Sequence, residues 1–264
     1  MKAGVTIKKY ILMLAPSVLL LSVLLACNNQ QDAGATTPGN NINQQTTNHS
    51  STSTSTSTLE QNSSVVISSL FSKSSLSDSI VIDSINEDRS IRAEQQTDKG
   101  TLLMVSNGKE ERGHLNVSST QGQEGDQSFQ SNYSIIYKYD GQDKVLFELP
   151  AYIFIQPSEK KLKFVKVSFK DADVYALTPQ YKTGHGLEAY VLAIDKQSGD
   201  AFPLEIVKDG HVFKRLLYSE SEPVLNVENN SLVVHSPIGA GTPKEDAKDV
   251  LYKLNLSTKQ LISE

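Results

Sequence analysis

From Val65 onward, short apolar stretches alternate with turn residues every 8–15 positions. The stretches are rich in Val, Ile, Tyr and Phe, as β-strands are, and few segments repeat apolar residues with the 3.6-residue period of a helix. About 200 residues are enough for one domain with its own core. The sequence therefore predicts a mainly β domain of antiparallel sheets over residues 65–264.

The expected strands are the apolar stretches between clusters of Gly, Pro, Asn, Asp and Ser. Two short helices are also expected, at Ser64–Lys73 and Pro243–Lys248. The expected strands are Ile80–Ile85, Thr101–Ser106, His114–Ser118, Ser134–Asp140, Lys144–Leu149, Tyr152–Gln156, Leu162–Phe169, Val174–Leu177, Glu188–Asp195, Phe202–Val207, Phe213–Tyr218, Val224–Val227, Ser231–Ser236, Val250–Leu256 and Gln260–Ser263.

A hairpin pattern recurs around Asp140, Asp195 and Asn255, which are 55 and 60 residues apart. In each copy an apolar run ends at the Asp or Asn, and a turn leads into a second apolar run. These hairpins resemble the outer hairpins of β-propeller blades, which implies a propeller-like or blade-repeat arrangement. Turns of any antiparallel sheet select Asp, Asn, Gly and Lys, so a sandwich, barrel or curved sheet is the alternative.

The N-terminal residues have the composition of an export signal. Lys2, Lys8 and Lys9 precede the apolar run Ile11–Leu25, which is shorter than the about 20 residues that a membrane-spanning helix needs. We therefore predict a signal peptide over residues 1–26, and exclude it from the fold.

The signal ends in Leu24-Leu25-Ala26-Cys27, and Cys27 is the single cysteine of the chain. This sequence resembles the lipobox of bacterial lipoproteins, although Leu25 is bulkier than the usual occupant of its position. The resemblance implies cleavage before Cys27 and diacylglycerol on its sulfur. It implies a protein held by lipid at the extracytoplasmic face of a bacterial cell membrane, where the acyl chains supply about 0.8 kcal/mol per buried methylene.

Residues 27–64 are dominated by Asn, Gln, Ser, Thr and Gly. Such a segment cannot bury enough apolar surface to offset its ordering entropy. We predict a disordered tether between the lipid and the β domain. Removing residues 1–26 removes three lysines and no acid, so the net charge falls from −5 to −8, which argues against a nucleic-acid partner.

The β region contains no recognisable catalytic or metal-binding motif. Its histidines His114, His185, His211 and His235 have no partner at helical metal spacing, and no nucleophile elbow or complete calcium loop is present. Accordingly, we assign no catalytic residue, metal or cofactor.

Two loops are the best candidates for contact with a partner. The segment Thr183–Gly186 would present His185, flanked by Tyr181 and Tyr190, which we expect to be exposed; the second loop is Gly239–Lys244. The leading hypothesis is a non-enzymatic binding or interaction module with a protein or cell-wall partner. The alternatives are a cell-envelope hydrolase with a site assembled from distant residues and a regulatory lipoprotein that restrains a membrane partner.

The lipobox generates a direct prediction. The Cys27→Ala precursor should remain unlipidated, and the protein should no longer partition into the detergent phase during phase separation. If this variant still partitions fully, the apolar run is an uncleaved anchor and the predicted lipid attachment is wrong.

Overall fold

The computed structural model describes residues 67–72, 76–239, 243 and 247–264. The chain divides into two units, residues 1–60 and 61–264, and the described residues belong to the second. The predicted signal peptide, Cys27 and the whole of the predicted tether lie outside the described residues. In the part of the chain that is described, no helix has the length and apolarity needed to cross a membrane.

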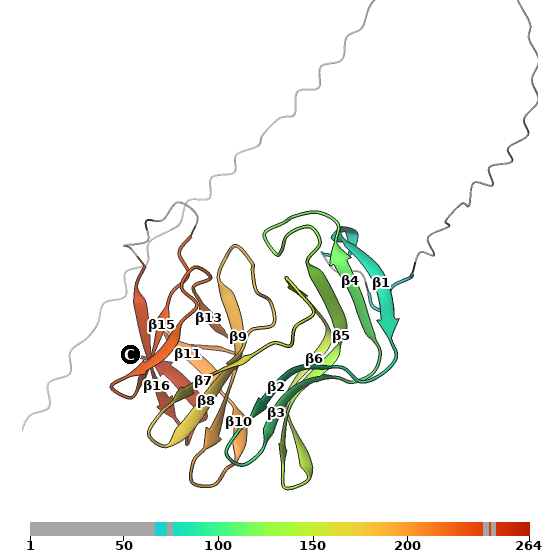
Figure 1. The fold of residues 1–264 in the computed structure, drawn as a ribbon. Helices are drawn as coiled ribbons and strands as arrows, with labels where there is room; N and C mark the ends of the chain where they lie inside the picture. Colours follow the sequence, from blue (N-terminus) through green and yellow to red (C-terminus); the bar gives the residue numbers. More distant parts are fainter. Residues whose placement is uncertain (1–66, 73–75, 240–242, 244–246) are drawn as a thin grey trace, which may run out of the picture. The chain divides into compact units, whose positions relative to one another are not determined.

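The prediction of a mainly β, largely antiparallel fold is confirmed (Figure 1). The expected helices are not found at residues 67–72, 243, 247 and 248; the remainder of those two segments lies outside the described residues. The described helical element is a short 3₁₀ turn, η1 (Ser77–Ser79). The Ser69 hydroxyl instead donates to Glu111 and accepts a bond from the amide of Phe71. Such side-chain bonds compete with helix formation.

The first sheet is built on a long strand, β5, to which the other strands add. β4 pairs with the first part of β5, β3 pairs with the later part, and β6 pairs along its whole length. β1 extends β4 and β2 extends β3, so the described strands run in the order β1-β4-β5-β3-β2. The bounds are β1 (Ile80–Asn86), β2 (Ile91–Gln96), β3 (Thr101–Ser106), β4 (Glu110–Leu115), β5 (Gln127–Tyr139) and β6 (Gln142–Gln156).

The second sheet centres on β9, which pairs with β8, β10 and β13. β10 pairs with residues 192–194 of β9, and β13 pairs with residues 187–189. Tyr190 and Val191 therefore lie between these two pairings. The bounds are β7 (Phe164–Ser168), β8 (Ala172–Leu177), β9 (Leu187–Asp195), β10 (Ala201–Pro203) and β13 (Leu216–Tyr218).

The third sheet has the described order β12-β11-β17-β16-β15-β14. Its neighbours are antiparallel except for β11 and β17, which run parallel with Glu205 opposite Gln260. The bounds are β11 (Glu205–Lys208), β12 (His211–Phe213), β14 (Leu225–Glu228), β15 (Ser231–His235), β16 (Asp249–Asn255) and β17 (Gln260–Ser263).

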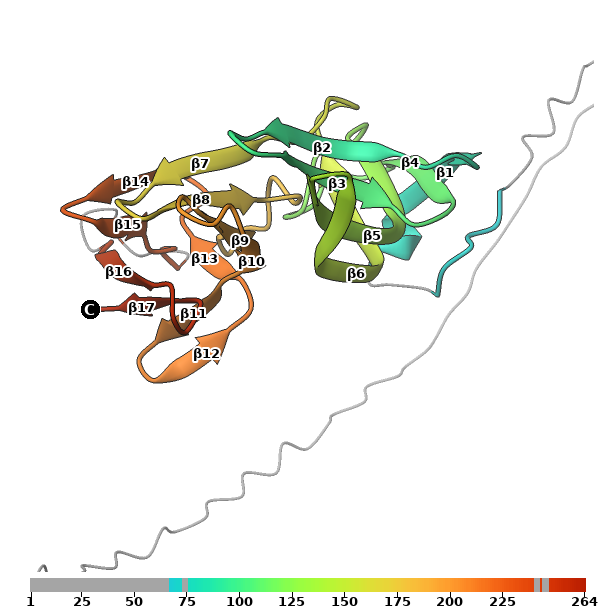
Figure 2. The same ribbon diagram turned by 90° about the horizontal axis from the view of Figure 1, so that it is seen from below.

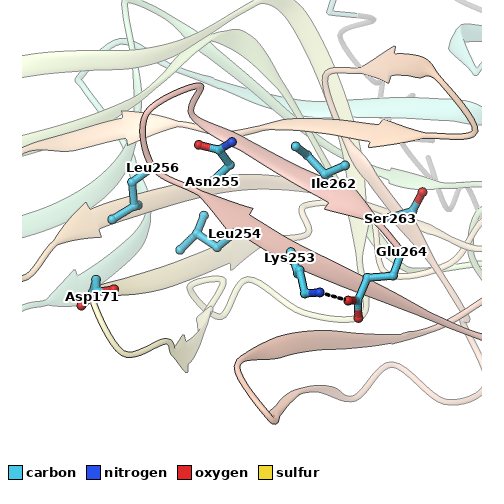
Figure 3. A pocket seen from close by; sticks show the side chains of 8 residues that line it. All are labelled: Asp171, Lys253, Leu254, Asn255, Leu256, Ile262, Ser263 and Glu264. Carbon is cyan, nitrogen blue, oxygen red and sulfur yellow. Dashed lines mark ion pairs between the residues drawn. The ribbon is translucent and has the colours of Figure 1, made fainter.

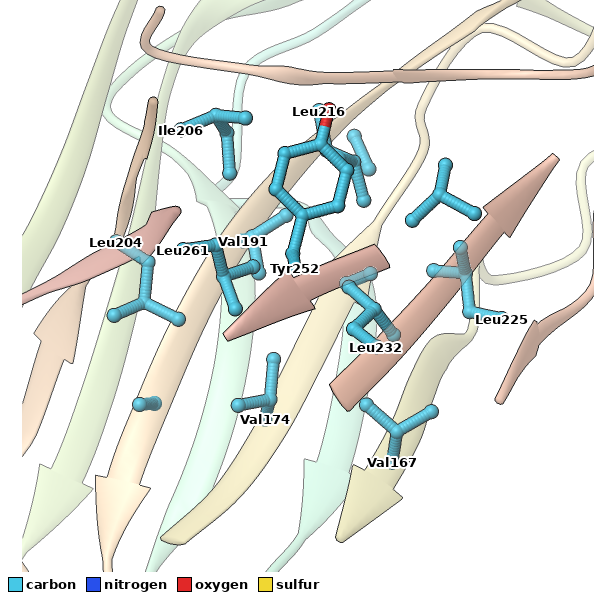
Figure 4. Close-up of a cluster of buried hydrophobic side chains, with 14 of the residues drawn as sticks. Val167, Val174, Val191, Leu204, Ile206, Leu216, Leu225, Leu232, Tyr252 and Leu261 are labelled. Carbon is cyan, nitrogen blue, oxygen red and sulfur yellow. The ribbon is translucent and has the colours of Figure 1, made fainter. Parts of the chain in front are cut away.

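The central strands of the second sheet, β8 and β9, are buried on both faces. Along β8, Tyr175 and Leu177 join the core shared with the first sheet, whereas Val174 and Ala176 join the core shared with the third sheet. This is the period-2 alternation of a strand, with apolar side chains on both sides. Figure 4 shows the second of these cores, in which Val191 of β9 lies among leucines of the neighbouring strands.

The hairpins expected around Asp140, Asp195 and Asn255 are found, as β5–β6, β9–β10 and β16–β17, with one in each sheet. The turns at Asp195 and Asn255 are alike: in each, the side-chain Oδ1 accepts bonds from the amides two and three residues later. Face-to-face sheets are consistent with the sandwich or curved-sheet alternative. The propeller-like arrangement stays a prediction.

Several strand predictions need correction. β2 and the first half of β5 were not expected, because Arg92-Ala93-Glu94-Gln95-Gln96 and Gln127–Asn132 are too polar to be recognised. The strand expected at His114–Ser118 ends at Leu115 and begins at Glu110. The two strands expected at residues 144–149 and 152–156 form one strand, β6, which continues through Pro150 because it pairs with β5 on one side only among the described strands.

The first sheet bends at the breaks between β1 and β2 and between β3 and β4 (Figure 2). A buried ion pair between Arg92 and Glu110 lies at these breaks. Glu110 is 0% exposed and accepts bonds from Arg92 Nε at 2.7 Å, from the Tyr133 hydroxyl at 2.7 Å and from the Ser90 hydroxyl at 2.8 Å. A second bond joins Arg92 Nη2 to Glu110, and Arg112 Nε donates to it at 3.0 Å.

Burial by itself would raise the pKa of the Glu110 carboxyl, but the donors from Arg92, Tyr133 and Ser90 outweigh burial and lower it. The Arg92 guanidinium also lies 3.7 Å from the centroid of the Phe129 ring. The carboxylate and the guanidinium therefore have partners in the sheet interior, as buried charges require.

Replacing Glu110 with Gln should lower the free energy of unfolding at pH 7 by about 3 kcal/mol, because Arg92 would remain buried without its counter-charge. The folded-state pKa of Glu110 lies below its unfolded value, so its contribution is present above the unfolded pKa, near pH 4, and is lost as the pH falls through the folded pKa. The difference between the two proteins should therefore shrink in acid.

Denaturant unfolding at pH 7 and at pH 3 measures both effects. The control is Glu94→Gln, which removes an exposed ion pair with Lys161 from the same sheet and should cost less than about 1 kcal/mol. Equal losses in the two variants, or a Glu110→Gln loss that does not depend on pH, would contradict the assigned role of the buried pair.

Candidate functional site

A groove of about 620 Å³ lies where strands of all three sheets meet. β6 of the first sheet forms one wall, and Tyr190 of the second sheet lies across from it. The chain entering β11 and the segment between β12 and β13 complete the lining. The lining residues are Leu146, Phe147, Glu148, Leu149, Pro150, Tyr152, Tyr190, Pro203, Leu204, Glu205, Lys214 and Arg215.

A bulge in β6 brings two aromatic side chains to the same face. Tyr133 of β5 pairs with Leu149, and Ser131 pairs with Tyr152. The chain therefore advances by three positions in β6 and by two in β5, so β6 has one extra residue at this bulge. Tyr152 lies five positions after Phe147, and in a regular strand the two side chains would point to opposite faces. Because the bulge adds one residue between them, both side chains point to the same face of the sheet.

The bulge includes an unusual backbone conformation. Ala151 has φ 48°, in the left-handed region that costs a non-glycine residue about 1–2 kcal/mol. Its amide donates to the side-chain Oδ1 of Asn132 at 2.7 Å. The adjoining strand β5 therefore holds the bulge that positions Tyr152.

The aromatic rings of the groove meet edge to face. The centroids of Phe147 and Tyr190 are 5.3 Å apart at 64°, and those of Tyr152 and Tyr190 are 6.1 Å apart at 79°. Edge-to-face pairs contribute about 0.5–1.5 kcal/mol beyond their buried area. Because Tyr190 is held by its neighbours on both sides, the aromatic wall is formed before any ligand arrives.

The groove combines neutral hydroxyls with a charged rim. Burial raises the pKa of Tyr152 and of Tyr190, and the nearby Arg215 opposes the shift at both. Both phenols therefore stay protonated at neutral pH and can donate hydrogen bonds. At the rim, Arg215 forms an ion pair with Glu188, and both side chains are half-exposed.

The loop that carries His185 lies elsewhere, between β8 and β9. The Glu220 carboxylate accepts bonds from the amides of Thr183 and Gly184, both at 2.9 Å, and His185 is exposed. Gly186 packs against Pro237, where a Cβ would come within 2.5 Å of the proline ring. The structure thus brings the His185 loop beside the segment leading into the other expected contact loop, whose residues 240–242 and 244 lie outside the described residues.

The two tyrosines expected to flank this loop behave differently from the prediction. Tyr181 is half-buried and donates to Asp126; burial, followed by that bond, raises its pKa to about 12. Tyr190 is only 8% exposed, so the expected exposure was wrong. The physical reason is that β9 belongs to a sheet covered on both faces, which leaves neither set of alternate side chains in water.

A second hollow, of about 670 Å³, lies along the β16–β17 hairpin beside Asp171 (Figure 3). Two of its charged groups pair with each other, since Lys253 forms an ion pair with Glu264. Asn255 bonds to its own turn. These polar groups are already engaged, and we therefore regard the aromatic groove as the better candidate.

No group of three or more His, Cys, Asp or Glu side chains in the described ranges is placed to hold a metal ion. Among the same residues, the carboxyl groups with a shifted pKa are all shifted downward, by hydrogen bonds and ion pairs. A general acid needs the opposite shift.

Comparisons with protein-family models, with curated proteins and with solved structures find no match for this chain. The groove is therefore interpreted from its own geometry. The sequence analysis placed Phe147 and Tyr152 in two separate expected strands and assigned neither residue to a site. The signal that could have found the groove is Pro150-Ala151, an interruption between two aromatic-bearing apolar runs.

Replacing Tyr190 with Ala should lower the free energy of unfolding by about 3–5 kcal/mol, because a buried aromatic ring and its edge-to-face contacts are lost. The matched control is His185→Ala, which should change it by less than about 0.5 kcal/mol because the side chain is exposed. Denaturant unfolding measures both. Similar small losses in the two variants would mean that Tyr190 is not part of the packed wall.

Proposed function

We propose that this protein is a lipid-anchored, extracytoplasmic binding protein whose recognition site is the aromatic groove. Support for the anchor comes from the lipobox resemblance at Cys27. Support for the site comes from the groove between β6 and Tyr190, with its preformed aromatic wall. The groove is the observation on which the proposal depends.

Its chemistry suits binding. Apolar side chains and aromatic rings supply contact area, and the protonated hydroxyls of Tyr152 and Tyr190 supply directional donors. Ligand sites in proteins commonly combine a mostly apolar lining with a few polar groups that fix orientation. A rigid wall also lowers the entropy cost of binding.

The tether and anchor add to this function. A binding site held near a membrane by a flexible segment meets membrane-proximal partners at a raised effective concentration. Modest affinity for an individual partner is then sufficient.

A hydrolase is the second candidate, because the carboxylates of Glu148 and Glu205 both line the groove. Paired carboxylates are the groups that glycoside hydrolysis requires.

Photo-cross-linking tests the binding site. With p-benzoylphenylalanine at Phe147, in cells that produce the full chain, we expect adducts of discrete mass. The control is the same probe at Val81, an exposed residue on β1, which lies at the edge of the first sheet away from β6. Adducts that are absent from residue 147, or equal at both positions, would contradict the proposed site.

Incubation of the purified full chain with peptidoglycan sacculi separates the two candidates. We expect no soluble fragments to be released. Fragment release that is lost in both Glu148→Gln and Glu205→Gln would instead support the hydrolase.

A further inference from the structure

β6 has an unpaired side next to the groove. Among the described strands it pairs with β5 and no other, and this pairing extends from Gln142 to Gln156. Over Gln142–Leu149, the backbone N–H and C=O groups of alternate residues on its other side have no hydrogen-bond partner among the described residues and can pair with an added strand. Farther along β6, the Ile155 amide already donates to the Gln180 side chain. Phe147, Glu148 and Leu149 of this strand line the groove itself.

We propose that the groove binds an extended peptide segment, which pairs with β6 as an added strand and packs one aromatic or aliphatic side chain against Phe147 and Tyr152. This inference rests on the proposed function, because it names the class of ligand for the same site. Main-chain bonds to β6 supply affinity, and the aromatic wall supplies specificity.

The geometry of the rings favours a peptide over a glycan. Phe147 and Tyr152 each meet Tyr190 at a steep angle, 64° and 79°, so the wall is a set of interlocked rings with Tyr190 only 8% exposed. A sugar needs an open ring face on which to stack. A side chain that enters from an added strand needs a preformed apolar recess, and the groove provides one.

Charge complementarity specifies the peptide further. The segment Val145–Leu149 of β6 has a single charge, Glu148, and this carboxylate is exposed. Opposite charges on directly facing strand residues stabilise a sheet, and like charges destabilise it. The peptide therefore carries a Lys or Arg opposite Glu148, close to its apolar anchor.

Arg215 and Lys214 lie on the other side of the groove, where Arg215 is already paired with Glu188. They do not remove the preference for a basic residue at the β6 side. They do disfavour a second basic residue that faces the β12–β13 segment. The net charge of −8 after loss of residues 1–26 also favours a basic ligand.

The test uses the full chain in detergent and a phage-displayed library of random twelve-residue peptides. We expect enrichment of sequences with an aromatic or aliphatic residue near a Lys or Arg. For a synthetic peptide of the selected sequence, Tyr152→Ala should weaken binding at least tenfold, since truncation of an aromatic at the centre of a site has such effects. Glu148→Lys should weaken it more than Glu148→Gln.

The matched control is Val81→Ala on β1, which should leave affinity unchanged. Tyr152→Phe keeps the ring and should retain most of the binding, and circular dichroism checks that each variant is folded. Equal affinity of Tyr152→Ala and the unmodified protein would overturn the inference.

Backbone methylation of the peptide tests strand pairing directly. N-methyl groups on one set of alternate residues should weaken binding at least tenfold, whereas those on the other set should change it less than about threefold, because only alternate amides face β6. Equal effects of the two sets would overturn the added strand.

A different outcome separates this inference from the proposed function. If no peptide is selected, but soluble peptidoglycan fragments bind and lose affinity in Tyr152→Ala, the groove remains a binding site and the peptide inference is wrong. If neither ligand binds and residue 147 yields no adduct, both proposals fail.

Discussion

The burial of β8 and β9, the central strands of the second sheet, on both faces is the constraint on which the rest of the structure depends. Every residue of β8 is buried, and nearly every residue of β9. A strand with apolar side chains on both faces leaves one set of them in water unless another layer covers each face. Apolar surface left in water loses about 25 cal/mol of stabilisation for each Å². The first and third sheets are therefore both required. The groove forms at Tyr190, between the β13 and β10 pairings of β9.

The first sheet meets this constraint by bending, and the bend has a polar interior. Where the long strands break, apolar alternation gives way to Arg92 and Glu110, each satisfied by hydrogen bonds. This polar network is fully satisfied in a single strand register. It therefore disfavours other registers, because a shifted strand would leave buried charges without partners. Asn132, at the same level of the sheet, holds the strained Ala151. Two consecutive residues of β5 thus serve the two features: Tyr133 bonds to Glu110 at the bend, and Asn132 holds the bulge of the groove.

The sequence allowed the β class and most strands to be predicted, because alternating Val, Ile, Tyr and Phe between turn residues is a local signal. β3 and β17 were predicted with their observed bounds. β2 was not, because its burial of Arg92 depends on Glu110, which lies in another strand. Tyr190 was misplaced for a related reason: alternation shows which residues share a face, but not whether another sheet covers that face. The groove could not be predicted for the same reason, because it depends on which strands of different sheets lie next to each other.

The parallel pairing of β11 with β17 bears on the order in which the molecule can assemble. Glu205 lies opposite Gln260, 55 residues later in the chain. Until β17 is available, β11 has the short hairpin partner β12 and lacks its other neighbour. Contacts of such separation are slow to form, because a long loop must close first. During synthesis, which begins at the N-terminus, the third sheet is completed last, and the apolar face of the second sheet that it covers stays exposed until then. During that interval the exposed apolar surface makes the chain most prone to aggregation and most available to chaperones.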